Sequence, residues 1–527
     1  MALHNRNVKV YELPVKGINL SAAIELLAEG ESLSTKNFYY RRGLRQKEGS
    51  QKLSSNRIDG DSPITGLHRF YYNTIDKVLI GAADDKISRY DDSLGTWTDL
   101  LTGRTATNLV NMVTWGALNR MYIADGTNLP KYIDSSLAIA TVAGAPTTTY
   151  MFLPYRDRLL SVDKTNPSYI RWSASFSDAT WEALADAIRM SGSGSIKVLK
   201  LHALAETNTG INAQVFAAKP TSCALFSATD LDPASAGYDA RLDDVSSEIG
   251  CISPFTVINT PIGTIFLGSD RQVYLLQYGS IQLIPIGAKI KSTTLNGRSL
   301  LDINLQNMEK AAAVWENNIY KLTIPIGANS YNTIQFWLDT SRGLENLAWY
   351  GPMEGMELTC FVHQNGEQDN NKLIGGGNNG YVYSVNEIGI YSDDGTAISS
   401  EWHGRPQAWQ NTGLDTRIFQ VELELTDPLG TVTLAFNDTV GAVGDTINIT
   451  GTGSGVFYGV YYYGEVYYTA SGQLVRILKQ LYNNKVEGRF LYPVVSFSSS
   501  TENLELYVLQ AEGKPIKKTF AQVGVTT

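Results

Sequence analysis

The most recognisable ligand-binding spacing in the sequence lies at residues 375–380. They read GGGNNG and match the G-x-G-x-x-G spacing of dinucleotide sites. In such sites a helix follows the glycines, and its N-terminus holds the pyrophosphate. Here residues 381–385 (YVYSV) follow, and their aromatic and β-branched character predicts a strand. Glycine and asparagine supply the positive φ of hairpin turns, so we expect a hairpin and predict no cofactor.

A second candidate is the turn at residues 92–97 (DSLGTW), which resembles the Asp-box turn of sialidases, a class of propeller enzymes. In the S-x-D-x-G-x-T-W pattern an Asp lies two residues before the Gly. Ser93 stands there in this sequence, and Trp97 falls one residue early. A sialidase also needs an arginine triad, a tyrosine nucleophile and an acid, and no spacing identifies that set. We therefore predict no catalytic residues and no enzyme, with a carbohydrate-binding or glycan-cleaving propeller as the alternative.

Metal-ligating residues are scattered. The five histidines lie far apart, without H-E-x-x-H or H-x-H spacing, so we predict no metal site. Paired aspartates such as Asp84 and Asp85 fall at predicted turns, where Asp favours the backbone conformation. A Ca²⁺ ion at one such turn remains an alternative. Three cysteines without CxxC spacing argue against a disulfide framework and are typical of folding in a reducing cytosol.

Composition and charge narrow the class of protein. The chain has 527 residues, of which 43% are hydrophobic and 18% charged, a globular balance. Its 47 glycines and 29 tyrosines, with few helix-period segments, favour an all-β chain dense in turns. A formal net charge of −9 makes it a poor sequence-independent DNA binder. Near its start the sequence has no apolar segment of the kind found in signal peptides, so we predict none. It also has no run of 18 apolar residues, so we predict no membrane-spanning segment.

The elements that would hold these turns repeat along the chain. Residues 78–97 read as a strand, a tight turn, a second strand and an aromatic residue after a turn. Looser versions recur at intervals of roughly 40 residues until about residue 395, which predicts a β-propeller of six or seven blades. Beyond residue 400, alternating runs such as residues 419–425 (FQVELEL) predict a β-sandwich or barrel. We expect an N-terminal docking segment at 1–60, a propeller at 61–400 and a C-terminal domain at 401–527. Closing a propeller brings its ends together, which would allow the N-terminal segment to pair with the C-terminal domain.

The N-terminal segment contains a basic strip. Residues 36–52 (KNFYYRRGLRQKEGSQK) carry six basic residues against one Glu. One interpretation is a solvated strand pair whose Lys and Arg residues guard a sheet edge. The other is a docking strip for an acidic partner or nucleic acid. The candidate docking residues are Lys36, Arg41, Arg42, Arg45 and Lys47.

The order of several motifs resembles a known family. Asn37-Phe38 is followed by Arg41, Gly43, Arg45 and Gly49, which is similar to an N-F-x-x-R-x-G-x-R-x-x-x-G segment after a helix-like patch. Further likenesses follow at residues 65–67 (TGL), 155–159 (YRDRL), 171–174 (RWSA) with Asp178 and Trp181, 249–254 (IGCISP) and 266–274 (FLGSDRQVY). In this order they resemble the nozzle, or packaged-DNA-stabilising, family of propeller-containing tail proteins of short-tailed bacteriophages. The likeness covers most of residues 15–400 and is weaker beyond.

The resemblance implies a structural protein of the virion tail, made in the cytoplasm of the host bacterium. Such proteins form a homo-oligomeric ring, usually a hexamer, below the portal and adaptor. They extend the DNA channel, help retain packaged DNA, allow its ejection, and carry tail fibres or spikes. An acidic channel wall would repel phosphates and let genomic DNA pass without sequence-specific binding. The basic strip would then suit a protein contact. A scaffold that binds a host protein is a third hypothesis.

Overall fold

The computed structural model describes residues 7–72, 77–105, 108–207, 210–292, 298–364, 372–408, 415–426, 430–438, 441–442, 444, 446–450, 474–480, 486–488 and 490–516. The described chain is almost entirely β-strand, as the composition predicts. It divides into two compact units. We call residues 1–49, 348–353 and 388–527 the end unit, and residues 50–347 and 354–387 the propeller unit.

The propeller unit is a ring of antiparallel sheets. The first four sheets follow in chain order: β6 (Ile64–Tyr71), β7 (Lys77–Ala83), β8 (Lys86–Asp91), β9 (Thr96–Leu101); β10 (Asn111–Trp115), β11 (Arg120–Ala124), β12 (Lys131–Ile133), β13 (Ile139–Thr141); β14 (Thr149–Tyr155), β15 (Arg158–Asp163), β16 (Tyr169–Trp172), β17 (Ile188–Arg189); and β18 (Val198–Thr207), β19 (Gly210–Ala218), β20 (Cys223–Ser227), β21 (Arg241–Ser246). Each sheet is an antiparallel meander.

Three further sheets complete the ring. They comprise β22 (Ile258–Thr260), β23 (Gly263–Leu267), β24 (Val273–Leu276) and β25 (Leu283–Pro285); β26 (Ala312–Glu316), β27 (Ile319–Ile324) and β28 (Ile334–Asp339); and β30 (Leu358–His363), β31 (Leu373–Gly377), β32 (Val382–Val385) and β5 (Gln51–Lys52). The described residues therefore form seven sheets in this unit, which settles the blade number that the repeat left at six or seven. The connections hold single-turn 3-10 helices: η2 (Gly116–Leu118), η3 (Leu184–Asp186), η4 (Pro254–Thr256), η5 (Ala288–Ile290), η6 (Leu300–Asp302), η7 (Met308–Lys310) and η8 (Leu344–Asn346).

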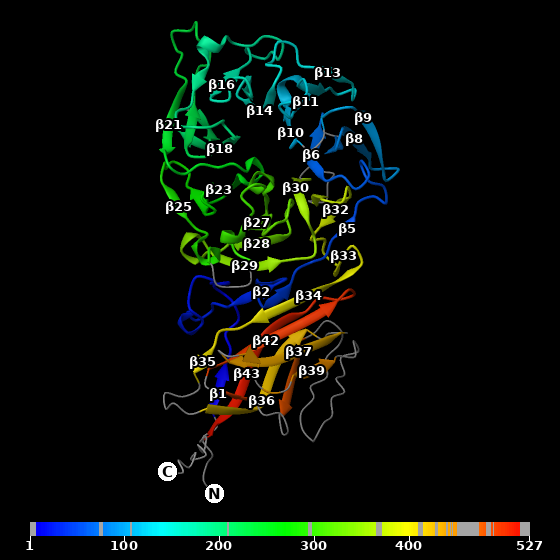
Figure 1. Ribbon diagram of the computed structural model, residues 1–527, viewed down its shortest axis with the longest axis vertical. Helices are drawn as coiled ribbons and strands as arrows, with labels where there is room; N and C mark the ends of the chain where they lie inside the picture. The colour runs from blue at the N-terminus through cyan, green and yellow to red at the C-terminus, as the bar shows by residue number, and fades with distance from the viewer. Residues whose placement is uncertain are drawn as a thin grey trace, which may run out of the picture. The chain divides into compact units, whose positions relative to one another are not determined.

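The first strands of the sheets line the axis of the ring. Each lies against the first strand of the next sheet, in the order β6, β10, β14, β18, β22, β26, β30 and back to β6 (Figure 1). Apolar side chains fill the space between adjacent sheets. At the closure, Ile64, Leu67 and Leu79 of the first sheet pack with Cys360 and Ile374 of the seventh. The unit is thus a closed seven-bladed β-propeller.

The propeller is closed by an early segment of the chain. Strand β5 pairs with β32, with Lys52 opposite Tyr383 and Gln51 opposite Ser384. The backbone N–H of Leu53 also donates to the carbonyl oxygen of Val382, and Ile58 is buried in the core between the seventh and first sheets. Residues 50–60 therefore belong to the propeller unit, and the boundary predicted after residue 60 lies too late in the chain.

The end unit is a sandwich of two sheets. One sheet runs β3 (Phe38–Tyr40), β4 (Leu44–Gln46), β43 (Glu505–Ile516), β36 (Asp415–Thr426) and β40 (Leu474–Gln480), with β1 (Asn7–Val10) on β43 and β41 (Val486–Gly488) on β36. The other runs β2 (Ser34–Lys36), β34 (Thr396–His403), β42 (Phe490–Ser499), β37 (Thr431–Asp438) and β38 (Gly441–Ala442), with β33 (Ser392–Asp393), β35 (Gln407–Ala408) and β39 (Ile447–Thr450) paired to it. The helix-like patch near residue 25 is the 3-10 turn η1 (Ile24–Leu26). Strand β29 (Ala348–Met353) also belongs to this unit.

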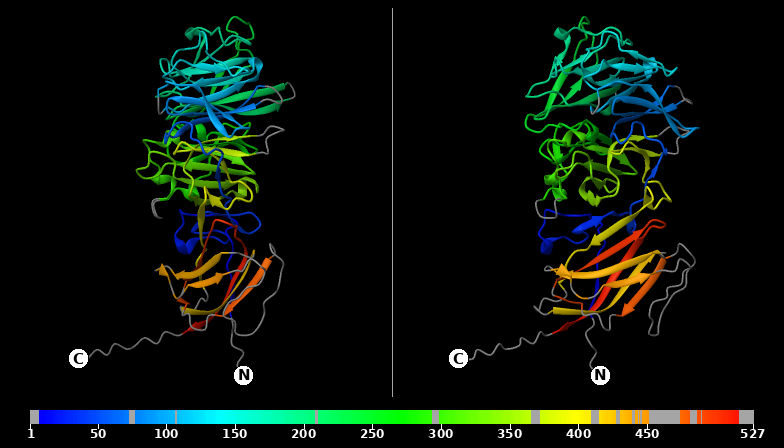
Figure 2. Two further views of the ribbon diagram at one scale, coloured as in Figure 1. Left: turned by 90° about the vertical axis from the view of Figure 1, so that its right-hand side faces the viewer. Right: turned by 45° about the vertical axis from the view of Figure 1, so that its right-hand side comes forward.

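Both ends of the chain build this sandwich. Asn7 lies opposite Gly513 and Leu44 opposite Leu506, so blue N-terminal strands lie beside the red C-terminal strand in Figure 2. One apolar core, including Phe38, Trp402 and Leu509, joins the two sheets. The expected pairing of the N-terminal segment with the C-terminal domain is confirmed. The N-terminal strands extend both sheets, and Phe38 and Leu44 add apolar side chains to the shared core.

Candidate functional site

The basic strip forms a hairpin in the end unit. Strands β3 and β4 pair directly, and β4 continues onto β43. The turn between them holds Arg41 and Arg42, whose side chains are exposed. The hairpin thus presents two adjacent guanidinium groups to solvent.

The other candidate docking residues are engaged within the end unit. Arg45 forms ion pairs with Glu48 (2.9 Å) and Glu505 (3.2 Å), and Lys36 is half-buried in β2 opposite Glu401. Lys47 Nζ lies 2.6 Å from Asp393 Oδ2, with both side chains only 5% exposed. The five basic residues therefore do not form one surface: only the Arg41–Arg42 pair is free to meet a partner through its exposed face.

The asparagine and the glycines of the strip stand at positions where the backbone conformation or a close contact requires them. Asn37 adopts a left-handed φ of 54°, and its side-chain amide donates to the carbonyl oxygen of Ser399 (2.8 Å). A Cβ on Gly43 would lie 2.9 Å from the carbonyl oxygen of Leu506, and a Cβ on Gly49 only 2.2 Å from that of Ser392. The segment from Asn37 to Gly49 thus fits the N-terminal hairpin against C-terminal strands.

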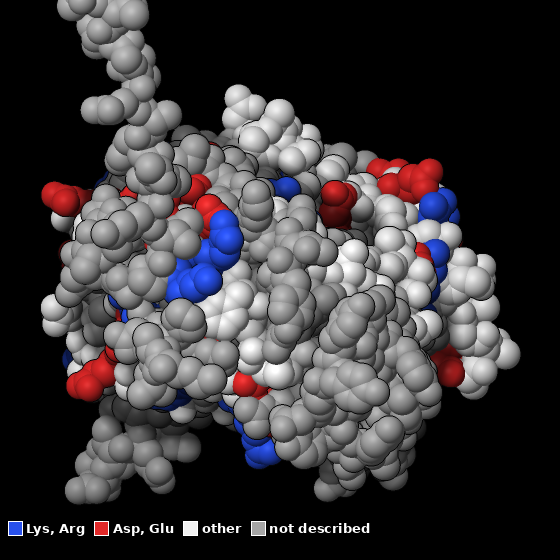
Figure 3. Space-filling model, turned by 90° about the horizontal axis from the view of Figure 1, so that it is seen from below, with Lys and Arg blue, Asp and Glu red and all other residues white. Residues whose placement is uncertain are grey.

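The coloured residues on the face in Figure 3 carry charges of both signs. The face shown in Figure 3 carries blue and red side chains in small interspersed groups. Such a distribution suits protein contacts better than phosphate binding, which needs clustered Lys and Arg.

The two sequence motifs that resemble ligand sites, GGGNNG and the Asp-box-like segment, form hairpin turns. The GGGNNG run ends β31 and leads through a turn with Gly380 at φ 80° into β32, so the predicted hairpin is correct. In the Asp-box-like turn, Asp91 Oδ1 accepts from the backbone N–H groups of Ser93 (2.9 Å) and Leu94 (3.1 Å). Among the described residues, no group of three or more His, Cys, Asp or Glu side chains could hold a metal ion.

A cavity that the sequence did not reveal lies on the propeller axis. It has a volume of about 580 Å³ and is formed where the first strands begin, by residues such as Asn111 of β10, Tyr150 of β14 and Lys200 of β18. Volumes of 300–1,000 Å³ are typical of small-molecule sites. Its wall carries four lysines, Lys164, Lys197, Lys200 and Lys310, and two carboxylates, Asp125 and Glu309.

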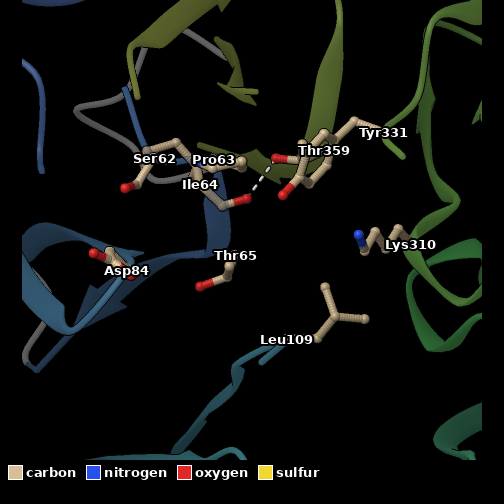
Figure 4. Close-up of a pocket in the computed structure, with 9 residues that line it drawn as sticks. All are labelled: Ser62, Pro63, Ile64, Thr65, Asp84, Leu109, Lys310, Tyr331 and Thr359. Atoms are coloured by element: carbon tan, nitrogen blue, oxygen red, sulfur yellow. Dashed lines mark hydrogen bonds between the residues drawn. The ribbon is translucent and has the colours of Figure 1, made fainter. Parts of the chain in front are cut away.

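A smaller space adjoins the axial cavity. It measures about 80 Å³ and shares Leu109 and Lys310 with the larger one. In Figure 4 the side chains of Lys310 and Leu109 point toward the space beside Thr65, and Thr359 Oγ1 donates to the carbonyl oxygen of Ile64 (2.5 Å). The wall here combines one cation, Lys310, and one carboxylate, Asp84, with apolar and hydroxyl groups.

The inner strands also hold two histidines that stay neutral. Burial, and then the charge of Lys200, lower the pKa of His68 to about 4, and burial lowers the pKa of His202 to about 4. His68 Nε2 lies 2.7 Å from Thr114 Oγ1, and His202 Nδ1 lies 2.8 Å from Thr264 Oγ1. Neither histidine therefore adds positive charge to this part of the propeller at neutral pH.

The cavity residues could not be found from local spacing. The four lysines are separated by up to 146 positions in the sequence (164 to 310) and come from three different blades. Only their position before a strand could have indicated them. Lys197 and Lys310 each stand just before the first strand of a blade, which begins at Val198 or at Ala312.

Comparison with known proteins gives only distant structural likenesses. No family model and no curated protein matches the chain. Among solved structures, one titled "YCF48 bound to D1 peptide" is 9% identical with a TM-score of 0.38, covering 67% of this chain and 97% of that one. Another, titled "Crystal Structure of Mitotic Checkpoint Complex", is 11% identical with a TM-score of 0.40, covering 69% and 98%. At these values neither likeness carries an argument about this chain. No helix of the described chain is long and apolar enough to cross a membrane.

Proposed function

We propose that this chain is a structural component of the tail of a short-tailed bacteriophage. In this proposal, copies form a ring, usually sixfold in the family that the sequence resembles, below the portal and adaptor. The ring extends the DNA channel, helps retain the packaged genome until ejection, and carries fibres or spikes. The protein is made in the bacterial cytoplasm and ends in the virion tail. It needs no cofactor and is not an enzyme.

The observation that carries the proposal is the structural role of the residues behind the family resemblance. The segment from Asn37 to Gly49 ties the two ends of the chain into one sandwich, as described above. Such residues specify an architecture rather than a reaction site.

The blade motifs of the resemblance are structural in the same way. Arg158 donates to the carbonyl oxygen of Ser173 and to Glu182 (2.9 Å each). Asp178 accepts from Arg120 (2.6 Å) and from Tyr122 (2.7 Å), which lie in the preceding sheet. These polar contacts are partly or fully buried: those of Arg158 lie within one blade, and those of Asp178 tie that blade to the preceding one. A rigid propeller is a suitable building block for a ring.

The size of the axial cavity bears on the path of DNA. A space of about 580 Å³ suits a small molecule and not a nucleic-acid duplex. In a tail ring, DNA would therefore pass between copies arranged around a common axis and not through the propeller. The net charge of −9 is consistent with a channel to which phosphates do not adhere.

The glycan-cleaving alternative finds less support at the cavity. A sialidase needs an arginine triad, which the described wall of the cavity lacks, and most other glycosidases use two carboxyl groups across the scissile bond. Asp125 is occupied: it accepts from the backbone N–H groups of Thr127 (2.9 Å) and Asn128 (2.8 Å) and pairs with Arg104 (3.4 Å). That leaves Glu309 as the other carboxylate of the wall.

The docking role of the end unit can be tested with charge reversal. Changing Arg41→Glu and Arg42→Glu together should weaken binding to the portal–adaptor complex at least about tenfold, because two exposed cations are inverted at the contact. Binding can be measured by co-sedimentation with the purified complex. The matched control is Arg156→Glu with Arg241→Glu, two exposed arginines of the propeller unit. Equal binding by both double variants would show that the hairpin does not contact the portal–adaptor complex.

A further inference from the structure

The axial cavity has more positive than negative charge on its wall. Four lysines line it, and of the two carboxylates Asp125 is already neutralised by the buried guanidinium of Arg104. Glu309 Oε2 lies 3.8 Å from Lys197 Nζ, with side chains 50% and 38% exposed, which makes a weak pair. A partly open cavity with more lysines than carboxylates on its wall attracts an anion.

Lys200 is the most informative of these lysines. It lies in β18 among the inner strands, and within the described residues its ammonium group has neither a hydrogen bond nor an ion pair. Burial lowers its pKa, which means that the surroundings disfavour its positive charge. The Lys200 side chain is half-buried, and a bound anion would favour its charged form.

The remaining lysines have weak, replaceable partners. Lys164 Nζ donates to Thr127 Oγ1 (3.1 Å), and Lys310 Nζ donates to the carbonyl oxygen of Ser330 (3.0 Å) above the ring of Tyr331. Neither contact neutralises the ammonium charge. Because Lys164, Lys200 and Lys310 come from different blades, they can meet several anionic groups of one ligand at once.

The rest of the wall is largely apolar. Met151, Ile252, Pro254 and Phe255 contribute to it, and Tyr150 adds an aromatic ring. Apolar walls with a few convergent charged groups are the usual composition of small-molecule sites. A phosphate chain would meet the lysines, and a planar organic group would pack on the apolar side.

From this arrangement we propose that the axial cavity of the propeller binds a small molecule that carries several phosphate groups, of the size of a nucleotide. Lys200 holds the phosphate chain from the inner strands, and Lys164, Lys197 and Lys310 surround it at the mouth. The site is independent of the proposed tail role, since it uses the propeller unit alone.

Titration calorimetry on the full-length chain at low salt tests the site. The probes are inorganic tripolyphosphate, a nucleoside triphosphate and the nucleoside without phosphate. Both phosphate-bearing probes should bind and the nucleoside should not. Tighter binding of the triphosphate than of tripolyphosphate would show that the apolar wall contributes. Raising the salt concentration should weaken binding, because the attraction is ionic.

Lysine variants locate the site. Lys200→Gln should raise the Kd for tripolyphosphate by about tenfold or more, because a charge-assisted hydrogen bond in a partly open cavity is lost. Lys310→Gln should have a smaller effect in the same direction, and it serves as the test if Lys200→Gln does not fold. Lys16→Gln, at an exposed lysine of the end unit, should leave the Kd unchanged. Absence of binding by either phosphate probe, or equal Kd values for all three variants, would overturn the proposal.

Discussion

The two units differ in how far apart along the chain their paired strands lie. In the propeller unit, most partners are neighbours in sequence, as in the β6 to β9 meander between residues 64 and 101. In the end unit, β1 and β4 pair with β43, nearly the whole chain away. The propeller unit is therefore assembled mainly from local hairpins, whereas the end unit joins strands from both ends of the chain. Strand β5 is the exception in the propeller unit, because it pairs with β32 more than 300 residues later in the chain. This long-range pairing makes the comparison testable.

The largest effect should come from removing that closing strand. A fragment of residues 61–387 lacks β5 and the buried Ile58, whereas a fragment of residues 50–387 keeps both. Loss of a buried aliphatic side chain alone costs about 2–5 kcal/mol. We expect the shorter fragment to unfold at a clearly lower temperature than the longer one, measured by circular dichroism. Equal unfolding temperatures would mean that the propeller is stable without β5, on pairings between strands that are neighbours in sequence alone.

A smaller effect should follow from breaking the buried ion pair of the end unit. Lys47→Met leaves Asp393 buried without its cation, which should lower the free energy of unfolding by about 3–5 kcal/mol. Urea unfolding measures this change. The double variant Lys47→Met with Asp393→Leu should recover much of the loss, because no unpaired charge remains. If the double variant is no more stable than the single one, the unpaired charge of Asp393 does not cause the loss of stability.

The smallest effect should be the pH dependence of the propeller unit. His68 and His202 have a pKa of about 4 in the folded protein and about 6.5 in an unfolded chain. The unfolded state therefore binds more protons between these values, and stability is lost as the pH falls from about 6.5 toward 4. Unfolding of the 50–387 fragment measured across this range should show the loss. His202→Asn should reduce its slope, and an unchanged slope in that variant would exclude His202 as a contributor.

The sequence was most informative where structure is local. The hairpin at residues 375–385 and the turn after Asp91 were recognisable because glycine, asparagine and aspartate determine turns through their own backbone. The division at residue 60 differs from the structure because the pairing of Gln51 and Lys52 with β32 leaves no local trace.

The candidate site was less accessible to sequence reasoning. The basic strip was visible as composition, but the partners that engage Arg45 and Lys47 lie at Glu505 and Asp393, far along the chain. Only the fold distinguishes the exposed Arg41 and Arg42 from these structural cations. The axial lysines were invisible for the same reason, because closure of the ring is what brings them together.

The central claim is that the chain is a ring-forming tail protein whose end unit makes the assembly contacts. Electron microscopy of the purified full-length chain mixed with its portal–adaptor complex tests this most directly, with the 50–387 fragment as the parallel sample. The account predicts closed rings seated on the complex for the full-length chain, and separate propellers for the fragment. Single full-length particles that never join the complex would contradict it.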